Sequence, residues 1–168
     1  MARALRMIDE AVRHQADLIL LPEAMDLGWT HPSARHEAEP IPLGYPALTL
    51  CEAARRHQVF ICAGLTEREG NAIYNSAVLI DPQGEILLKH RKIHELDLAH
   101  DLYGLGQRLE VVQTPLGAIG LMICADAFAE GQVIARTLGY MGADILLSPC
   151  AWAVPAGHDN LQDPYGDL

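Results

Sequence analysis

The sequence predicts a layered α/β fold with a mixed β-sheet, and three patterns support this prediction. The short, continuously apolar segment Asp17–Leu21 is typical of a strand buried on both faces. Before it, residues 3–15 have the period of an amphipathic helix. Turn residues at 81–84 and 114–117 each join two apolar segments, which indicates antiparallel hairpins. Helix–strand units combined with hairpins favour a mixed sheet over a purely parallel Rossmann sheet.

The first helix and strand lead to a candidate catalytic carboxylate. The strand Asp17–Leu21 stops at Pro22, and Glu23 follows directly. A residue in this position lies at the carboxyl end of a buried strand, where open α/β sheets bind ligands. The competing interpretation of Glu23 is a solvent-exposed loop acid, which is the commoner role of glutamate.

The next segment is a long loop, residues 24–45, rich in Pro, His and Gly. Loops of this length are uncommon in compact domains and often functional. Trp29 lies in it and either lines a pocket or packs over the core. The elements expected next are a helix at 46–57, a strand at 59–65, and a hairpin of strands 72–80 and 85–89.

The end of this hairpin carries three positive charges in four residues, on Lys89, Arg91 and Lys92, with His90 between them. Such a cluster is commonly solvent-exposed, but a preceding core strand can direct one of the side chains inward. His90 and His94 also have the i, i+4 spacing of a metal site. We rank a metallohydrolase using His90, His94 and His100 as the weakest hypothesis, because adjacent cationic side chains would repel a divalent cation.

A cysteine ends the strand of the second hairpin, whose strands are expected at 111–113 and 118–123. Cys124 stands where packing alone would favour Val or Ile, before a helix expected from Ala127 to Tyr140. Asp126 can cap this helix, and amides at a helix start would lower the pKa of the Cys124 thiol. The alternative is that Cys124 is a buried core thiol. Beyond the helix, a strand is expected at 144–147, and residues 154–168 have no periodicity.

Composition limits the classes of partner. The chain has 168 residues, half of them apolar, and a formal net charge of -10, which disfavours nucleic acid and anionic membranes as partners. We find no bilayer-spanning apolar run and no signal-peptide pattern, and expect a cytoplasmic protein. Four cysteines without a CxxC motif are expected to be reduced thiols.

Three motifs in order resemble the nitrilase superfamily of carbon-nitrogen hydrolases. They are LLPE ending at Glu23, RKIH containing Lys92, and GAIGLMICAD containing Cys124. Supporting matches are YNSA at 74–77 and GADILL at 142–147. Each motif is weak alone, but their order makes a specific signal that covers nearly the whole chain.

The resemblance implies an α-β-β-α sandwich of two mixed sheets and a catalytic triad of Glu23, Lys92 and Cys124. It implies a small amide, carbamoyl or nitrile substrate, no metal or organic cofactor, and a homo-oligomer. Ala125 follows the cysteine where the family often has an aromatic residue, and we expect it to bind substrate together with Trp29 and Trp152. The family's second glutamate has three candidates, which are Glu95, Asp97 and Asp101.

The resemblance also bears on domain extent. Residues 1–168 are expected to form a single carbon-nitrogen hydrolase domain that lacks the family's first strand and its C-terminal strands. The leading hypothesis is therefore a thiol hydrolase, or a fragment of one. The alternative is a truncated, catalytically weak remnant that acts as a binding or assembly module through exposed sheet edges.

Overall fold

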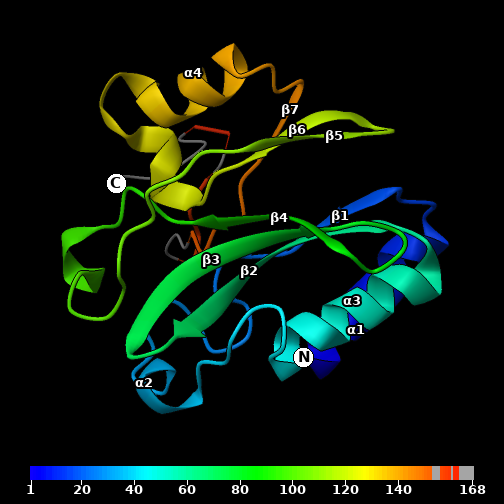
Figure 1. Cartoon of the computed structure of the whole chain (residues 1–168), viewed down its shortest axis with the longest axis horizontal. Coiled ribbons are helices and arrows are strands. Elements are labelled where there is room, and N and C mark those ends of the chain that lie inside the picture. Colours follow the sequence, from blue (N-terminus) through cyan, green and yellow to red (C-terminus); the bar gives the residue numbers. More distant parts are fainter. Residues whose placement is uncertain (153–155, 160, 163–168) are drawn as a thin grey trace.

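The computed structural model describes residues 1–152, 156–159, 161 and 162. It contains two β-sheets packed face to face, with helices on both outer sides (Figure 1). Helices α1 (Ala2–Arg13) and α3 (Tyr45–His57) cover the outer face of the larger sheet, and α4 (Val133–Tyr140) lies beyond the smaller sheet. This is the α-β-β-α sandwich that the resemblance implied.

The larger sheet has four strands in the order β1-β2-β3-β4. β1 pairs in parallel with β2, and the other pairs are antiparallel. The expected hairpin of β3 and β4 is confirmed. β2 runs on to Glu69, past the predicted end at Leu65, because its polar residues continue the ladder with β3. The strand bounds are β1 (Leu18–Leu20), β2 (Phe60–Glu69), β3 (Ala72–Ile80) and β4 (Ile86–Arg91).

The smaller sheet has three strands in the order β5-β6-β7. The hairpin of β5 (Val111–Thr114) and β6 (Gly117–Leu121) is confirmed, and β7 (Ile145–Leu147) joins β6 in parallel. β6 therefore has a strand on each side, so its carboxyl end is held in a defined position next to the end of β7.

The helix predicted from Ala127 to Tyr140 is wrong at its start. The chain instead forms two short 3₁₀ helices, η2 (Cys124–Phe128) and η3 (Glu130–Gln132), before α4 begins. Gly131 and Gln132 adopt positive φ angles of 64° and 55°, which an α-helix does not accommodate. A further short helix, α2 (Ala34–Glu37), lies in the segment 24–45 that was predicted as a loop, and η1 (Asp97–Ala99) lies between β4 and β5.

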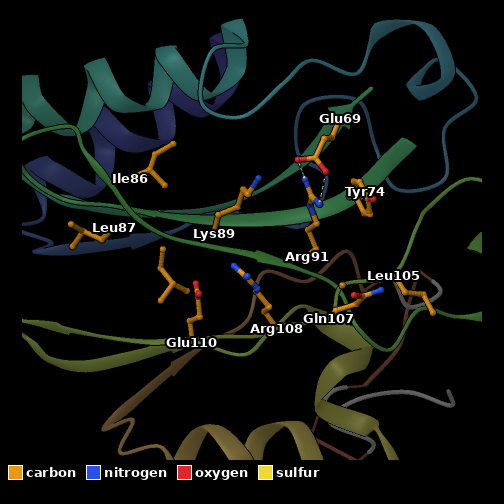
Figure 2. Close-up of a pocket in the computed structure, with 12 residues that line it drawn as sticks. Glu69, Tyr74, Ile86, Leu87, Lys89, Arg91, Leu105, Gln107, Arg108 and Glu110 are labelled. Carbon is orange, nitrogen blue, oxygen red and sulfur yellow. Dashed lines mark hydrogen bonds and ion pairs between the residues drawn. The ribbon is translucent and has the colours of Figure 1, made fainter. Parts of the chain in front are cut away.

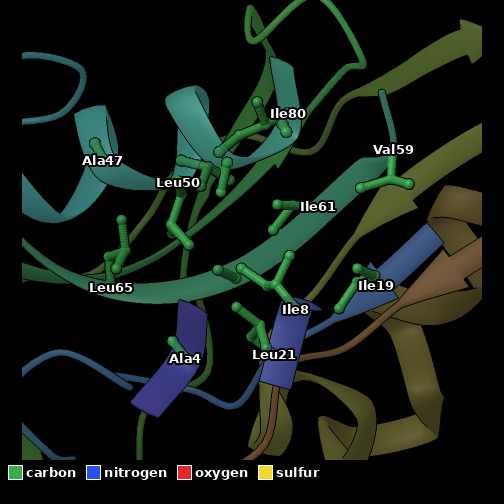
Figure 3. Packing of buried hydrophobic residues seen from close by; sticks show 14 residues of the cluster. Ala4, Ile8, Ile19, Leu21, Ala47, Leu50, Val59, Ile61, Leu65 and Ile80 are labelled. Atoms are coloured by element: carbon green, nitrogen blue, oxygen red, sulfur yellow. The ribbon is translucent and has the colours of Figure 1, made fainter. Parts of the chain in front are cut away.

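Two apolar clusters hold the layers together. In the first, Ile8 of α1 and Leu50 of α3 pack on Ile61 of β2 and its neighbours (Figure 3). The second lies between the sheets, where Leu79 and Ile119 are fully buried. Since burial of one such side chain stabilises a fold by roughly 1.5–3 kcal/mol, these clusters fix the relative position of the sheets and of the strand ends.

Two expectations concern the extent of the chain. The interpretation of residues 1–168 as one domain stays a prediction, and the unpatterned segment expected at 154–168 lies largely outside the described residues. Among the helices of the described part, none combines the length and apolar character needed to cross a membrane.

Candidate active site

The three residues of the expected triad follow strand ends. Glu23 lies shortly after β1, Lys92 directly follows β4, and Cys124 lies shortly after β6. Their relative exposures are 3%, 1% and 8%. Burial of an acid and a lysine is rare unless they are paired, so these residues need partners within the protein.

Lys92 is paired with two carboxylates. Its Nζ lies 2.8 Å from Glu23 Oε1 and 3.0 Å from Glu95 Oε1. Burial alone would lower the pKa of Lys92, but the two carboxylates outweigh it, and the pKa is raised. Lys92 is therefore a fixed ammonium inside a buried site.

The Glu23 carboxylate is held by donors on both oxygens. Its Oε1 accepts from Asn75 Nδ2 at 2.6 Å as well as from Lys92, and its Oε2 accepts from the backbone N–H of Ala151 at 2.9 Å. Gly64 of β2 passes so close that a Cβ there would lie 2.4 Å from Glu23 Cα. A glycine at this position is thus required for the backbone of Glu23 to approach the sheet.

Glu95 is the acid that the structure brings to the site, out of the three left open by the sequence. Its Oε2 accepts from Asn75 Nδ2 at 3.2 Å, and its Oε1 accepts from Trp29 Nε1 at 3.3 Å. Asp97 and Asp101 are instead exposed. Asn75 bridges the two glutamates, and it lies within the YNSA motif, which was the available signal for this arrangement.

Cys124 follows β6 in a strained backbone conformation, with a φ of +43°. Its N–H donates to Pro149 O and Ser148 Oγ, each at 3.1 Å. The expectation of a lowered thiol pKa is wrong. A hydrogen bond to Cys150, burial and the charge of Glu23 all raise the pKa of Cys124, and Lys92 opposes them only in part. The helix that begins at Cys124 is also only five residues long.

Cys150 is a site residue that sequence reasoning missed. It is exposed and lies next to Cys124, and the hydrogen bond from the Cys124 thiol lowers the pKa of Cys150 to about 6. Cys124 and Cys150 stand three residues beyond the paired residues Leu121 and Leu147. This register is a property of the fold, so no local sequence pattern indicated the pair.

Asp126 does more than the predicted capping of a helix. Its Oδ2 accepts from the N–H of Ile123 at 2.9 Å, as a cap does, and Oδ1 accepts from the N–H groups of Ile93 and His94. His90 Nε2 lies 2.8 Å from Oδ2. One buried carboxylate therefore ties the segment after Lys92 to the segment before Cys124.

Two of the three histidines of the metal hypothesis have other contacts. His90 is bound to Asp126, and His100 Nε2 lies 3.2 Å from the carbonyl oxygen of Glu95. The described part of the chain contains no group of three His, Cys, Asp or Glu side chains placed to hold a metal ion.

The three expected substrate-binding residues lie in different surroundings. The Trp29 ring centroid lies 5.6 Å from Lys92 Nζ, and Ala125 is buried in η2 beside Cys124. Trp152 is 37% exposed and packs on Phe128, with ring centroids 5.6 Å apart. Their role in binding stays a prediction.

A separate cavity of about 520 Å³ lies along the other side of β4 (Figure 2). Lys89 and Arg91 line it, whereas His90 and Lys92 are buried, as the alternation of side chains along a strand requires. Arg91 pairs there with Glu69. The expectation that one of the clustered cations points inward is thus confirmed for Lys92, and this cavity includes no member of the triad.

Comparison with known proteins extends these findings. The nitrilase of Pyrococcus abyssi is 34% identical over 158 residues, which cover 92% of this chain and 59% of that protein. The omega-amidase NIT2 of Danio rerio is 28% identical over 168 residues, covering 94% and 59%. The chain thus spans less than two thirds of the length of these relatives.

A solved structure shows the same fold. Nit3 of Saccharomyces cerevisiae, a member of branch 10 of the nitrilase superfamily, superposes with a TM-score of 0.77 at 21% identity, covering 98% of this chain and 60% of that one. The family model of the carbon-nitrogen hydrolases matches residues 1–162. The chain therefore belongs to the carbon-nitrogen hydrolase family, within the nitrilase superfamily.

Proposed function

We propose that this chain carries the site of a thiol-dependent hydrolase that cleaves a non-peptide carbon–nitrogen bond. The observation that supports this most strongly is the buried Lys92 ammonium between Glu23 and Glu95, close enough to Cys124 to influence its thiol pKa. A buried, preorganised charge beside a nucleophile is costly for stability and is typical of active sites.

The first step is formation of the thiolate. The raised pKa keeps Cys124 protonated near neutral pH, so the thiol needs a base when substrate arrives. Glu23 is the proposed base, since its carboxylate raises that pKa and is itself held in place by Asn75 and Ala151. The thiolate then attacks the amide carbonyl or nitrile carbon.

The second step is stabilisation of the charge that develops on the substrate oxygen or nitrogen. Lys92 provides a fixed positive charge, and the backbone N–H of Ala125 is the proposed second donor. One preorganised donor of this kind contributes roughly 2.7–4 kcal/mol to transition-state stabilisation. Glu95 keeps Lys92 charged and oriented while Glu23 exchanges a proton.

The remaining steps release nitrogen and regenerate the thiol. Ammonia or an amine leaves after protonation by Glu23, which leaves a thioester on Cys124. Glu23 then activates water to hydrolyse this thioester. Matches to a nitrilase and an omega-amidase support a small amide, carbamoyl compound or nitrile as substrate.

The test is ammonia release by the purified chain from a panel of short amides, N-carbamoyl amines and nitriles. We expect release from at least one class, its loss in Cys124→Ala, and its retention in the matched control Cys51→Ala, since Cys51 lies in α3. Equal rates for Cys124→Ala and the parent, or no release from any class by the folded chain, would contradict the proposal.

A further inference from the structure

Cys124 and Cys150 stand side by side because of strand register. β6 and β7 are parallel, and their register pairs Leu121 with Leu147. Beyond this pair, Met122 N donates to Leu147 O and Cys124 N donates to Pro149 O, so the two segments stay side by side as far as Cys124 and Cys150. The two side chains are close enough for a hydrogen bond between the sulfurs, which raises the pKa of Cys124 and lowers that of Cys150.

The spacing of such a pair suits a disulfide. Neighbouring strands lie roughly 4.7–4.9 Å apart, and disulfides join residues whose Cα atoms are roughly 4.4–6.8 Å apart. Cys150 is also fixed on its other side, because its carbonyl oxygen accepts from Glu23 N at 3.4 Å and the next N–H, of Ala151, donates to Glu23 Oε2. The two sulfurs therefore stay neighbours.

The two thiols differ in exposure and in pKa, and both differences favour oxidation at Cys150 first. Cys150 is exposed, and its pKa of about 6 makes it a thiolate near neutral pH, whereas Cys124 is 8% exposed and donates a hydrogen bond to it. Cys62 is fully buried in β2, with a pKa raised to about 12 by burial. An oxidant in solution thus meets Cys150 as the accessible thiolate next to a second thiol.

We propose that Cys124 and Cys150 form an oxidisable dithiol site, which a hydroperoxide converts into a reversible disulfide. Its effect on activity rests on the proposed role of Cys124 as nucleophile, but formation of the disulfide does not. Oxidation closes the site to substrate, and it also protects Cys124 from irreversible oxidation to the sulfinic acid.

The chemistry balances in two steps. The Cys150 thiolate attacks one peroxide oxygen, the O–O bond breaks, and a sulfenic acid and hydroxide form. The sulfur of Cys124 then attacks the sulfenic sulfur, the S–O bond breaks, and the departing hydroxide takes the Cys124 proton to become water. Counted from two thiols, the sulfurs lose two electrons, and hydrogen peroxide gains them to yield two water molecules. A dithiol reductant reverses the change.

The test uses the full chain, treated at pH 7 with a small excess of hydrogen peroxide, alkylated with iodoacetamide and digested. We expect peptides containing Cys124 and Cys150 to be linked, with the loss of two hydrogen atoms, and the link to disappear after dithiothreitol. Sulfinic acid at Cys124 without a linked peptide, or preferential linkage of other cysteines, would overturn the proposal.

Variants separate the roles of the two thiols. Cys150→Ser should give no link and should let Cys124 proceed to sulfinic acid, so that dithiothreitol no longer restores the free thiol. The control Cys51→Ser should behave like the parent. If Cys150→Ser resists over-oxidation as well as the parent does, the protective role is overturned. A parent chain that links Cys124 to Cys150 but releases no ammonia when reduced would overturn the proposed function and leave the dithiol site standing.

Discussion

The Lys92 ammonium and the Glu23 carboxylate form an ion pair in which Nζ lies 2.8 Å from Oε1 and each side chain is 1% exposed. Glu95 adds a second carboxylate on the same ammonium at 3.0 Å. The two buried carboxylates would repel each other without that lysine, which links the stability of the fold to the candidate active site.

Replacement of Lys92 by Met should therefore lower the free energy of unfolding by about 3–5 kcal/mol, the usual cost of leaving a buried charge unpaired. Urea unfolding measures this change. The matched control is Lys89→Met, whose partner Glu67 keeps Arg91 and so should lose much less. Similar losses for both variants would show that the Lys92 pair has no special energetic role.

Asp126 should prove to be a positioning residue. Asp126→Asn weakens the acceptor shared by Ile93, His94 and Ile123, and hydrogen bonds to a charged group contribute about 1.5–3 kcal/mol each. We expect a lower kcat with little change in KM, because the distance between Lys92 and Cys124 is no longer fixed. Steady-state kinetics checks this, with exposed Asp97→Asn as control. A change in KM alone would contradict the positioning role.

Stability at acid pH should depend on Glu67. Burial favours its neutral form, but hydrogen bonds from Arg91, Lys89 and Ser76 outweigh burial and lower the pKa of Glu67 from 4.5 to about 2. A pKa lowered by folding means that this contribution is complete above about pH 4.5 and is lost as the pH falls towards 2.

Glu67→Gln should accordingly cost most stability at pH 6 and least at pH 2.5, as measured by urea unfolding at both values. The exposed Glu69→Gln serves as control and should show a much smaller effect. A Glu67→Gln effect that does not vary with pH would show that the carboxylate charge is not what stabilises this cluster.

Alkylation rates should distinguish the four cysteines. At pH 7 we expect iodoacetamide to label Cys150 first, because it is exposed and its pKa is about 6, and Cys62 last. Cys150→Ala should speed labelling of Cys124, since the hydrogen bond that raises its pKa most is removed. Timed labelling and peptide mass spectrometry measure both. If Cys124 were labelled fastest in the parent, the reactive thiolate would be Cys124 and not Cys150.

The strand ends explain how much of the site could be predicted from the sequence. Glu23, Lys92 and Cys124 each follow a strand, so apolar runs and short motifs were enough to select them. The strand before Glu23 is not buried on both faces as predicted, since Leu20 is 47% exposed. Glu95 could not be selected over Asp97, because only the three-dimensional path after Lys92 decides which acid turns back towards the ammonium.

Other features depended on pairing between distant segments. Cys150 became a neighbour of Cys124 through the register of β6 and β7, which local patterns do not contain. The helix break at Gly131 was missed because its apolar spacing resembled a continuous helix, whereas positive φ angles at two residues interrupt it. The apolar spacing therefore predicts that a helix forms, but it does not reveal the residues at which the backbone leaves helical angles.

The most direct test of the central claim is to locate the covalent intermediate. The chain is mixed with a substrate from the ammonia assay and quenched in acid within its first turnovers, and peptide mass spectrometry then identifies the acylated residue. We predict an acyl group on Cys124 that hydroxylamine removes, and none on Cys124 in Glu23→Gln. Turnover with acylation only at Cys150, or with no acylated cysteine under conditions that trap thioesters, would contradict the account.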